Sequence, residues 1–407
     1  MTDPSAGFTP EWTRFCEQLQ QTLVEVGAGV IANSRSTLDR DEGLRMVLRQ
    51  LQHSLERDFE EHDVEHPVFG PVFTDTYHTL ADAPDYAAFD ALVSGRCTYR
   101  LSGQLGSADS INFTTLAPRP ARPEQPTPGM TWNPWSSANG DSKPTAGRVT
   151  TGTLDLADLD PDDQGCFEFV VSAQRPAAGT WLPMSEATDR IVVRNMYEGA
   201  YHQHRRRNPA RLRLDCLDGP PRPAAYSTDN LRAGLLAVLR GVDRIPSGRA
   251  VLFDRIRAAA DGRFSDDDSF WTASGSNSRT RFHEGYWAVV EDEALLIELD
   301  SVPACSFWSL GLTNAWMESL DFRLFPININ STSAHLEPDG SLRIVIAHRD
   351  PGLPNWLDVA GHDHGAMLWR WNDLASPRAL PRTTLVPLKS LDQEERRVST
   401  QPHRDDA

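Results

Sequence analysis

The sequence predicts a mainly β protein of the α+β class: two jelly-roll-like antiparallel β-sandwich units joined by helices, with a helical hairpin at the N-terminus. One observation is a repeated phrase, since Gly165 and Trp181 are 16 residues apart and so are Gly340 and Trp356. The other is the order of local patterns, which runs helices, short strands, helices, short strands. Repeats at fixed spacing mark one structural unit used twice, and short strands between turn residues favour antiparallel sheets. We therefore expect two related sandwiches.

The N-terminal residues predict the hairpin. Apolar residues recur every three or four positions over 9–33, which is the period of an amphipathic helix. A second helix follows, which Asp39 or Asp41 can cap. Its apolar stripe extends to Phe59, and Pro67 ends it. Such a hairpin needs a body to pack on.

Two groups of short β-rich runs predict the sandwiches, and a helical connector separates them. Helical spacing resumes at Thr228, Pro246 is expected to break the helix, and a shorter helix is expected over 249–260. The chain then divides into a hairpin (1–68), a first sandwich unit (69–220), a helical connector (221–275), a second sandwich unit (276–375) and a polar tail (376–407) that frays.

Composition limits the classes of function. The 407 residues carry a formal net charge of −17, which repels nucleic acid at long range. No apolar run reaches about 18 residues and no basic and apolar leader begins the chain, so we expect neither membrane insertion nor export. The five cysteines are scattered, which favours a reducing compartment over a disulfide framework. We expect a cytoplasmic protein with a small-molecule ligand, and a homo-oligomer stays open.

One motif lies in the second half of the chain: an Asp-Gly pair, an alternating strand, a proline, an Asn-Trp-Leu sequence and a strand with an arginine, at Asp339, Gly340, 342–346, Pro351, 355–357 and Arg370. It resembles the bacterial domain of unknown function 1214. The first half is similar to the preceding unit of such proteins, through Pro84, Tyr99, Gly103, Trp181 and Arg194. The resemblance extends from about residue 45 to residue 371. It implies successive jelly-roll-like sandwiches with helices between them, and no established activity.

The two copies differ where chemistry could lie. Strand alternation places His348 and Asp350 on one face, and the first copy has Ala173 and Arg175 at these positions. An acid beside a histidine fixes its tautomer and raises its basicity, as general acid–base catalysis requires. We therefore name His348 and Asp350 as candidate catalytic residues. The alternative is a polar turn at the end of a strand.

Aromatic and arginine side chains near this turn are candidates for binding a substrate. Trp356 and its first-copy equivalent Trp181 are expected to plug the ends of the sandwiches, with each indole N–H bonded to a nearby carbonyl; ligand stacking is the alternative. Trp308 is expected to line a pocket with Trp356 and His348. Arg349 or Arg370 could anchor a carbonyl or anionic group.

His362 and His364 flank an aspartate in a turn after Trp356, and with His348 they offer three imidazoles. A His-x-His pair with a third ligand recurs in metal sites, whereas exposed turns of this composition are more often solvated. We therefore predict no metal and keep the two histidines as weak candidates. No nucleotide-binding or hydrolase signature occurs, and no cofactor is predicted.

The basic run at 202–207 stands out in an acidic chain. It could bind an anionic group, or it could be a solvated loop that pairs with an acidic face.

Two classes of function remain open. The first is an enzyme that acts by acid–base chemistry on a bulky apolar small molecule such as a lipid, terpenoid or polyketide. The second is a binding or assembly protein without chemistry, which takes a small molecule or a carbohydrate on its jelly-roll scaffold. A deep pocket lined by Trp308, Trp356 and His348 would favour the enzyme, and burial of these residues would favour the binding protein.

Overall fold

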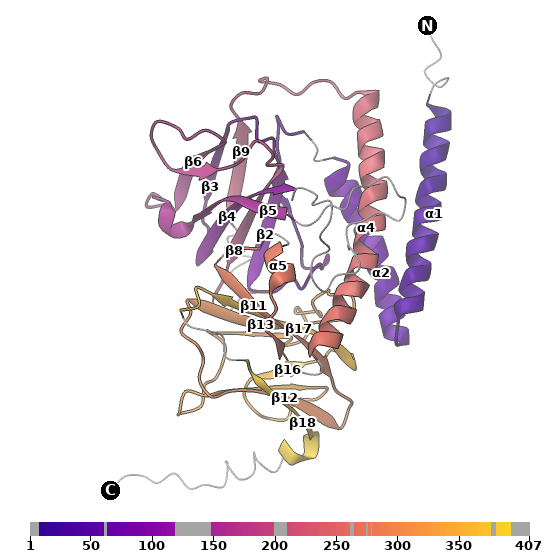
Figure 1. The fold of residues 1–407 in the computed structure, drawn as a ribbon, viewed down its shortest axis with the longest axis vertical. Helices are drawn as coiled ribbons and strands as arrows, with labels where there is room; N and C mark the ends of the chain where they lie inside the picture. The colour runs from indigo at the N-terminus through magenta and orange to yellow at the C-terminus, as the bar shows by residue number, and fades with distance from the viewer. Residues whose placement is uncertain are drawn as a thin grey trace, which may run out of the picture.

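The structure is a computed structural model that describes residues 8–60, 63–118, 148–198, 210–260, 264–273, 276–277, 279–375 and 380–391. Two β units lie one above the other, and helices α1 (Thr9–Asn33), α2 (Thr37–His53) and α4 (Thr228–Ala260) lie together along one side (Figure 1). This arrangement confirms the predicted fold class. None of the described helices has the length and apolar character that crossing a bilayer requires.

The first β unit is a sandwich of two sheets. The five-stranded sheet has the order β1-β2-β8-β4-β5 and the four-stranded sheet the order β7-β6-β3-β9. The strands are β1 (Gly70–Pro71), β2 (Tyr86–Leu92), β3 (Tyr99–Gln104), β4 (Ser110–Pro118), β5 (Arg148–Asp155), β6 (Cys166–Ser172), β7 (Trp181–Pro183), β8 (Arg190–Met196) and β9 (Arg211–Cys216).

The second β unit repeats this topology strand for strand. Its sheets have the orders β10-β11-β17-β13-β14 and β16-β15-β12-β18. The strands are β10 (Phe264–Ser265), β11 (Thr280–Ala288), β12 (Glu293–Leu299), β13 (Phe307–Thr313), β14 (Asn328–Asn330), β15 (Leu342–Ala347), β16 (Trp356–Asp358), β17 (His364–Asn372) and β18 (Arg382–Pro387). The pairs β6–β7 and β15–β16 are parallel, and the other pairs of named strands are antiparallel.

The repeated phrase forms the same local structure in both units. Gly165 and Gly340 both have a left-handed backbone, with φ of 74° and 84°, which glycine adopts without a steric penalty. The indole N–H of Trp181 donates to the Ser172 carbonyl at 3.1 Å, and that of Trp356 donates to the Ala347 carbonyl at 3.1 Å. The predicted indole hydrogen bonds are therefore confirmed in both copies.

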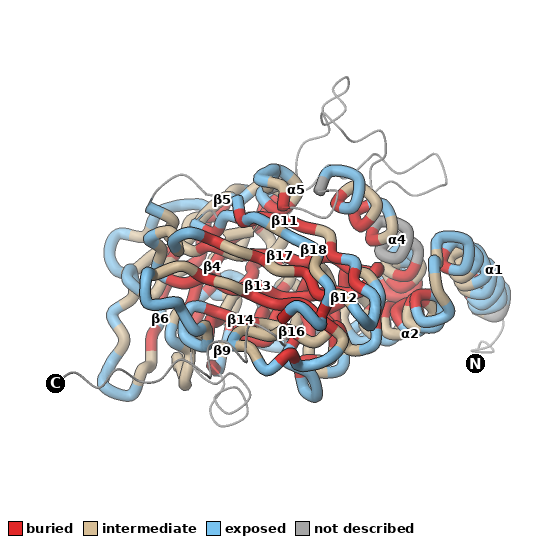
Figure 2. The backbone as a smooth tube through the Cα atoms, turned by 90° about the horizontal axis from the view of Figure 1, so that it is seen from below, coloured by how far each residue is buried: buried red, intermediate tan, exposed pale blue. Residues whose placement is uncertain are grey.

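Each sandwich closes over its own apolar core, and buried segments run through both units while much of α1 is exposed (Figure 2). The first core contains Phe113, which meets Phe167 and Phe169 edge-on. The second core is richer in tryptophan. Trp369 and Trp371 stack with ring centroids 4.9 Å apart, and Trp308 lies against both.

The helical hairpin forms as predicted, but with a different cap. The side chain of Ser36 accepts the backbone N–H of Asp39 at 3.0 Å, so Ser36 and not Asp39 or Asp41 is the N-cap of α2. Asp39 instead lies in the first turn, where its carboxylate accepts the N–H of Arg35 at 3.0 Å. A serine at this position satisfies a free N–H of the first turn. After α2 the chain continues through a π-helical turn, Ser54–Asp58.

One helix and both ends of the second unit differ from the prediction. Helix α4 continues through Pro246, where a break was expected; its first half packs on α1 and α2 and its second half on β11 and β17, and tertiary packing of this kind overrides local propensity. The second unit extends past residue 375, because β18 pairs with β12 as an edge strand. It also begins earlier, since β10 pairs with β11.

The two β units contact one another through both apolar and polar side chains. Asn372 on β17 donates to the Tyr86 hydroxyl on β2 at 3.0 Å. Arg370 donates to the carbonyl of Ala81, and its guanidinium lies 5.6 Å from the centre of the Tyr86 ring. Helix α5 (Ser269–Ala273) covers part of the second unit nearby.

Candidate functional site

The structure does not bring His348 and Asp350 together, so the predicted dyad is corrected. His348 Nε2 lies 3.1 Å from the carbonyl oxygen of Val289 and 3.5 Å from the Asp363 carboxylate. Asp350 is exposed and accepts the N–H of Gly352 at 2.8 Å. Asp350 instead fits the alternative, a polar turn at the end of a strand, because its carboxylate accepts a backbone N–H of its own loop.

The other candidate substrate contacts are dispersed. Trp308 is buried in the second core and Trp356 lies on the opposite sheet, half-buried against Val345 and Leu391. Arg349 is exposed and 3.4 Å from Asp292. Arg370 is half-buried at the contact between the units, where loss of solvent lowers the pKa of its guanidinium. Because Trp308 is buried in the second core and Trp356 lies in a separate apolar cluster, these two indoles do not face His348 across a common cavity in the described part of the chain.

His362 and His364 have a structural partner that the sequence did not indicate. His362 Nε2 lies 2.8 Å from the Glu42 carboxylate, and His364 Nε2 lies 3.1 Å from that of Asp39. Both carboxylates belong to α2, so the turn before β17 holds the helical hairpin against the second unit. Within the described ranges, no group of three or more His, Cys, Asp or Glu side chains has a geometry that could hold a metal ion.

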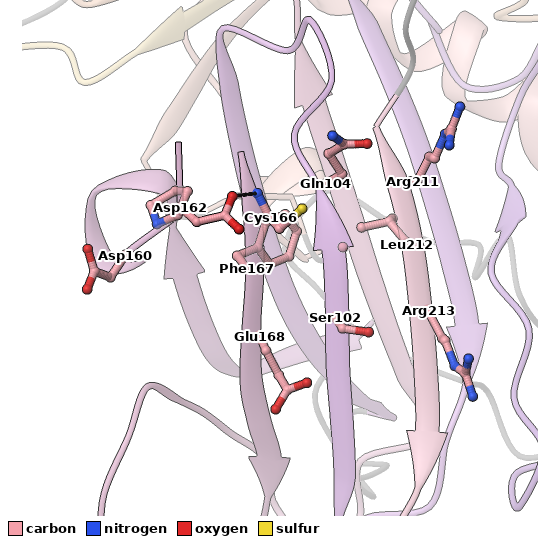
Figure 3. Close-up of a pocket in the computed structure, with 12 residues that line it drawn as sticks. Ser102, Gln104, Asp160, Asp162, Cys166, Phe167, Glu168, Arg211, Leu212 and Arg213 are labelled. Atoms are coloured by element: carbon pink, nitrogen blue, oxygen red, sulfur yellow. Dashed lines mark hydrogen bonds between the residues drawn. The ribbon is translucent and has the colours of Figure 1, made fainter. Parts of the chain in front are cut away.

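An open groove of about 760 Å³ lies on the outer face of the four-stranded sheet of the first unit. Figure 3 shows its floor, formed by side chains of the adjacent strands β6, β3 and β9. One wall is the loop before β6, which contains Asp160, Pro161 and Asp162. The Asp162 carboxylate accepts the N–H of Cys166 at 2.8 Å, a bond drawn in Figure 3 that fixes this wall to the strand.

Strand register arranges the groove side chains in rows. Ser102 on β3 pairs with Glu168 on one side and Arg213 on the other, and Gln104 pairs with Cys166 and Arg211. Residues two apart on a strand point to the same face, so both rows project outward. The rows place a carboxylate and a thiol on β6, a hydroxyl and an amide on β3 and two guanidinium groups on β9. With strand spacings of about 4.8 Å, the three strands span about 10 Å.

The second unit has carboxylates where the groove has neutral side chains. Strand pairing makes Glu298 equivalent to Ser102, and Asp300 follows as the equivalent of Gln104. Glu298 accepts from Arg343 at 3.2 Å, and Asp300 lies 2.9 Å from Arg382, the equivalent of Arg213. The charges of the second unit are therefore neutralised within the sheet.

In the first unit this neutralisation is only partial, since Asp215 and Glu168 lie 3.4 Å and 3.7 Å from Arg100. Arg213 pairs with Asp215 on its own strand at 2.8 Å, and among the residues that the structure describes no carboxylate pairs with the exposed Arg211. A guanidinium presents paired donors that match a carboxylate or phosphate. The groove can therefore bind an anionic group at Arg211 and Arg213 and polar groups at Gln104, Ser102 and Glu168.

Sequence reasoning missed this groove although a signal was present. Between β6 and β15 the two copies differ at His348, and between β3 and β12 they differ at Ser102 and Glu298. The equivalence of β9 and β18 is not visible in the sequence, because β18 lies in the segment that reads as a polar tail. The basic run at 202–207 lies outside the described residues.

Comparison with known proteins places the chain among uncharacterised relatives. The model of a family described as a protein of unknown function (DUF1214) matches residues 292–373. The crystal structure of an uncharacterised protein from Burkholderia cenocepacia is 31% identical, with a TM-score of 0.79, and the match covers 93% of this chain and 97% of that chain. A protein from Vibrio parahaemolyticus is 8% identical, with a TM-score of 0.44, over 85% of this chain and 98% of that chain. No curated protein matches the chain.

Proposed function

Because the chain belongs to the DUF1214 family of proteins of unknown function, whose description assigns no reaction, we propose a function from the groove of the first unit. The protein binds, without converting it, a hydroxyl-rich small molecule or saccharide that carries an anionic group. The observation that carries this proposal is the difference between the two copies: Ser102 and Gln104 replace the carboxylates that neutralise arginine in the second unit.

Charge supports the anionic part of the ligand. In a chain of net charge −17, an arginine without a carboxylate partner makes a local positive site that a negative ligand can occupy with charge-assisted hydrogen bonds. Arg211 and Arg213 lie two residues apart on one strand and project to the same face. They can bind the two oxygens of one carboxylate or two neighbouring anionic groups.

Shape supports the polar part of the ligand. The groove is open along the sheet and polar side chains line it beside apolar ones such as Phe167 and Leu212, which differs from the enclosed apolar cavity that a lipid or terpenoid requires. Gln104 offers both a donor and acceptors, Ser102 a hydroxyl and Glu168 a carboxylate that accepts from sugar hydroxyls. A binding protein without chemistry is one of the two classes that the sequence left open.

Acid–base catalysis by His348 on an apolar substrate stays a prediction with less support. His348 lies against a backbone carbonyl and the exposed Asp363, while Trp308 is buried in the second core and Trp356 lies in a separate apolar cluster. We keep the cytoplasm as the proposed location, because scattered cysteines that are all free are typical of reducing compartments.

Calorimetric titration with matched ligands tests the proposal. Glucuronate and galacturonate are compared with glucose and galactose, and short acidic oligosaccharides with their neutral counterparts. We expect the acidic member of a pair to bind and the neutral member to bind at least about tenfold more weakly, since a charge-assisted hydrogen bond contributes about 1.5 to 3 kcal/mol. Salt should weaken binding.

The double variant Arg211→Ala/Arg213→Ala should lose this binding and keep its fold, because both side chains are exposed. The matched control is Arg382→Ala, which removes the equivalent arginine of the second unit and should leave binding unchanged. Failure of every acidic ligand to bind the parent, or equal binding by the double variant, would contradict the proposal.

A further inference from the structure

The outer edge of β9 is an unpaired sheet edge. Strand β9 ends the four-stranded sheet of the first unit, and within the described ranges no strand pairs with its outer side. The N–H of Leu217 donates to the Thr98 carbonyl at 2.8 Å, in register with the pairing of β3 and β9. The odd-numbered residues of β9 therefore turn their backbone groups toward β3. The N–H and C=O groups of Leu212, Leu214 and Cys216 point away from the sheet, where a further strand can bind.

This edge is open and has apolar side chains beside it. A groove of about 470 Å³ lies along it, lined by residues 212–216 on one side and by residues 65–69, which lead to β1, on the other. Val68 in this lining and Leu217 after β9 are 59% and 49% exposed. A second polypeptide that binds here would bury apolar surface as well as pair with the backbone.

The equivalent edge of the second unit carries prolines. The N–H of Leu388 donates to the Asp292 carbonyl at 2.8 Å, so the odd-numbered residues in and beside β18 face its outer edge. Pro381 and Pro387 are two of them, and Pro381 is the equivalent of Leu212. Proline has no N–H, and proteins place it on exposed edges to prevent pairing with other chains. The edge of β9 has backbone donors where the edge of β18 has proline.

We propose that two copies of the chain associate through β9, edge to edge and antiparallel, about a two-fold axis at Leu214. The two four-stranded sheets then form one continuous sheet, in which β7-β6-β3-β9 is followed by the same strands of the other copy in reverse order. The partner at this edge is therefore a second copy of the same chain, and the prolines beside β18 leave the second unit outside the interface.

Backbone geometry and charge select the same register. Edge-facing groups must pair with one another, so Leu214 pairs with Leu214 of the other copy and Leu212 pairs with Cys216. Arg213 then lies opposite Asp215 of the other copy, and by symmetry this pair occurs twice. Opposite charges across neighbouring strands stabilise a sheet. A shift of the pairing by two residues sets Arg213 opposite Arg213 or Asp215 opposite Asp215, which like charges disfavour.

The side chains of the outer face are placed for these contacts. Arg213 is exposed, and Figure 3 shows its side chain on the side of β9 away from β3. The Asp215 carboxylate lies 2.8 Å from Arg213 and 3.4 Å from Arg100, and its two oxygens can accept further hydrogen bonds. Arg211 falls opposite Leu217 of the other copy, whose exposed apolar surface its stem can cover while its guanidinium stays in solvent.

Sedimentation velocity of the full chain, measured without ligand, tests the proposal separately from binding in the groove. We expect a species of twice the mass of one chain that grows with protein concentration. In hydrogen exchange, the amides of Leu212, Leu214 and Cys216 should gain protection as concentration rises, whereas those of Arg213 and Asp215 already face β3. A parent that sediments as a single chain at every concentration would overturn the proposal.

Charge exchange tests the register. Arg213→Asp and Asp215→Arg each set like charges opposite one another at two places, and each should weaken association at least about tenfold. The double variant Arg213→Asp/Asp215→Arg reverses both pairs and should restore association. If the double variant associates as weakly as the single variants, the two residues do not face one another and the proposed pairing is wrong.

A proline on the edge tests the backbone contact. Leu212→Pro removes an N–H that faces outward and copies the residue at the equivalent position of the second unit, so the fold should be kept and association lost. Circular dichroism checks the fold. The matched control is Arg382→Ala, which changes the equivalent of Arg213 beside the proline-bearing edge and should associate as the parent does. A dimer that persists in Leu212→Pro, or that Arg382→Ala dissociates, would contradict an interface at β9.

Discussion

Asp85 shows how one buried side chain depends on the contact between the two units. It lies just before β2, fully buried, and neither carboxylate oxygen makes a hydrogen bond of regular geometry. Ser309 and Asn330 of the second unit lie close to it. Burial raises the pKa of Asp85 to about 6, and the charge of Arg370 only partly opposes this. The fold therefore prefers the neutral carboxyl group.

Asp85→Asn should stabilise the protein above neutral pH. When the pKa of a carboxyl is higher in the folded than in the unfolded chain, the folded protein loses stability as pH rises from about 4 to about 6. An amide does not ionise, so the free energy of unfolding near pH 7.5 should rise by about 1 to 3 kcal/mol and change less between pH 5 and 7.5. Urea unfolding at both pH values measures this.

The control for this variant is Asp350→Asn, which changes an exposed aspartate in a turn and should leave the pH dependence as it is in the parent. Equal pH dependence in Asp85→Asn and the parent would show that Asp85 does not titrate in this range.

At the scale of single residues, the sequence predicts those contacts whose partners are close to one another along the chain. The indole bonds of Trp181 and Trp356 could be predicted because each acceptor lies nine residues away in the same phrase. The neighbour of His348 could not, since Asp363 arrives from a later turn and strand alternation gives only the face of a side chain. Register between strands, which sets the rows of the groove, is likewise a tertiary property.

At the scale of elements, two histidine–carboxylate pairs join the helical hairpin to the second unit. Burial would lower the pKa of His362, but the hydrogen bond and charge of Glu42 raise it above its usual value. Burial would raise the pKa of Glu42 and of Asp39, but the imidazoles of His362 and His364 help to hold each below its usual value. The charged pair of His362 and Glu42 and the hydrogen bond between His364 and Asp39 therefore hold α2 in place.

The pH range in which this contact stabilises the protein follows from the directions of these pKa shifts. The His362 contribution is complete below the unfolded pKa of about 6.5 and is lost as pH rises through the folded value. The carboxylate contributions are complete above about pH 4.5 and are lost as pH falls through their lowered values. The contact should be strongest between about pH 5 and 6.5.

A double-mutant cycle with His362→Ala and Glu42→Ala should give a coupling free energy of about 1 to 3 kcal/mol near pH 6, because both side chains are mostly buried. The coupling should fall near pH 8.5. As pH is raised from 6 to 8.5, the protection of backbone amides from hydrogen exchange should be lost first in α2 and not in β12. A coupling that does not change with pH would mean that the imidazole is neutral throughout.

Prediction of the elements succeeded where periodicity and packing agree. The helix over 9–33 was predicted to the residue because its apolar spacing is also its packing face. Helix α4 is longer than predicted. The proline is a local signal for a break, whereas the elements that pack on the helix before and after Pro246 are distant in sequence. Strand β18 does not follow from the sequence, because an edge strand of mostly exposed residues carries few apolar side chains.

At the scale of the whole molecule, α4 connects two sandwiches that share one topology. Arg249 is buried near the middle of this connection; it donates to Thr79 before β2 at 2.6 Å and lies 3.5 Å from Glu318 after β13. Burial raises the pKa of Glu318, and the charges of Arg249 and Arg49 oppose this. One side chain thus links the helix to segments of both units, and the duplicated phrase could predict two sandwiches but not this link.

We expect this link to make the two units unfold together. Calorimetry of the parent should give one endotherm with a ratio of calorimetric to van't Hoff enthalpy of about one. Arg249→Met keeps the apolar volume and removes the charge, which leaves Glu318 with Arg49 alone and should lower stability by about 3 kcal/mol, as breaking a buried pair does. The variant's endotherm should broaden or divide, because each half of α4 then keeps only its own apolar partners.

The matched control is Arg257→Met, an arginine of the last turn of α4 with an exposed side chain. It should keep a single endotherm within about 0.5 kcal/mol of the parent, as surface substitutions usually do. Two endotherms in the parent would mean that the units unfold independently and that α4 belongs energetically to one of them. In that case hydrogen exchange in α4 would follow one sandwich, and its pattern would identify which.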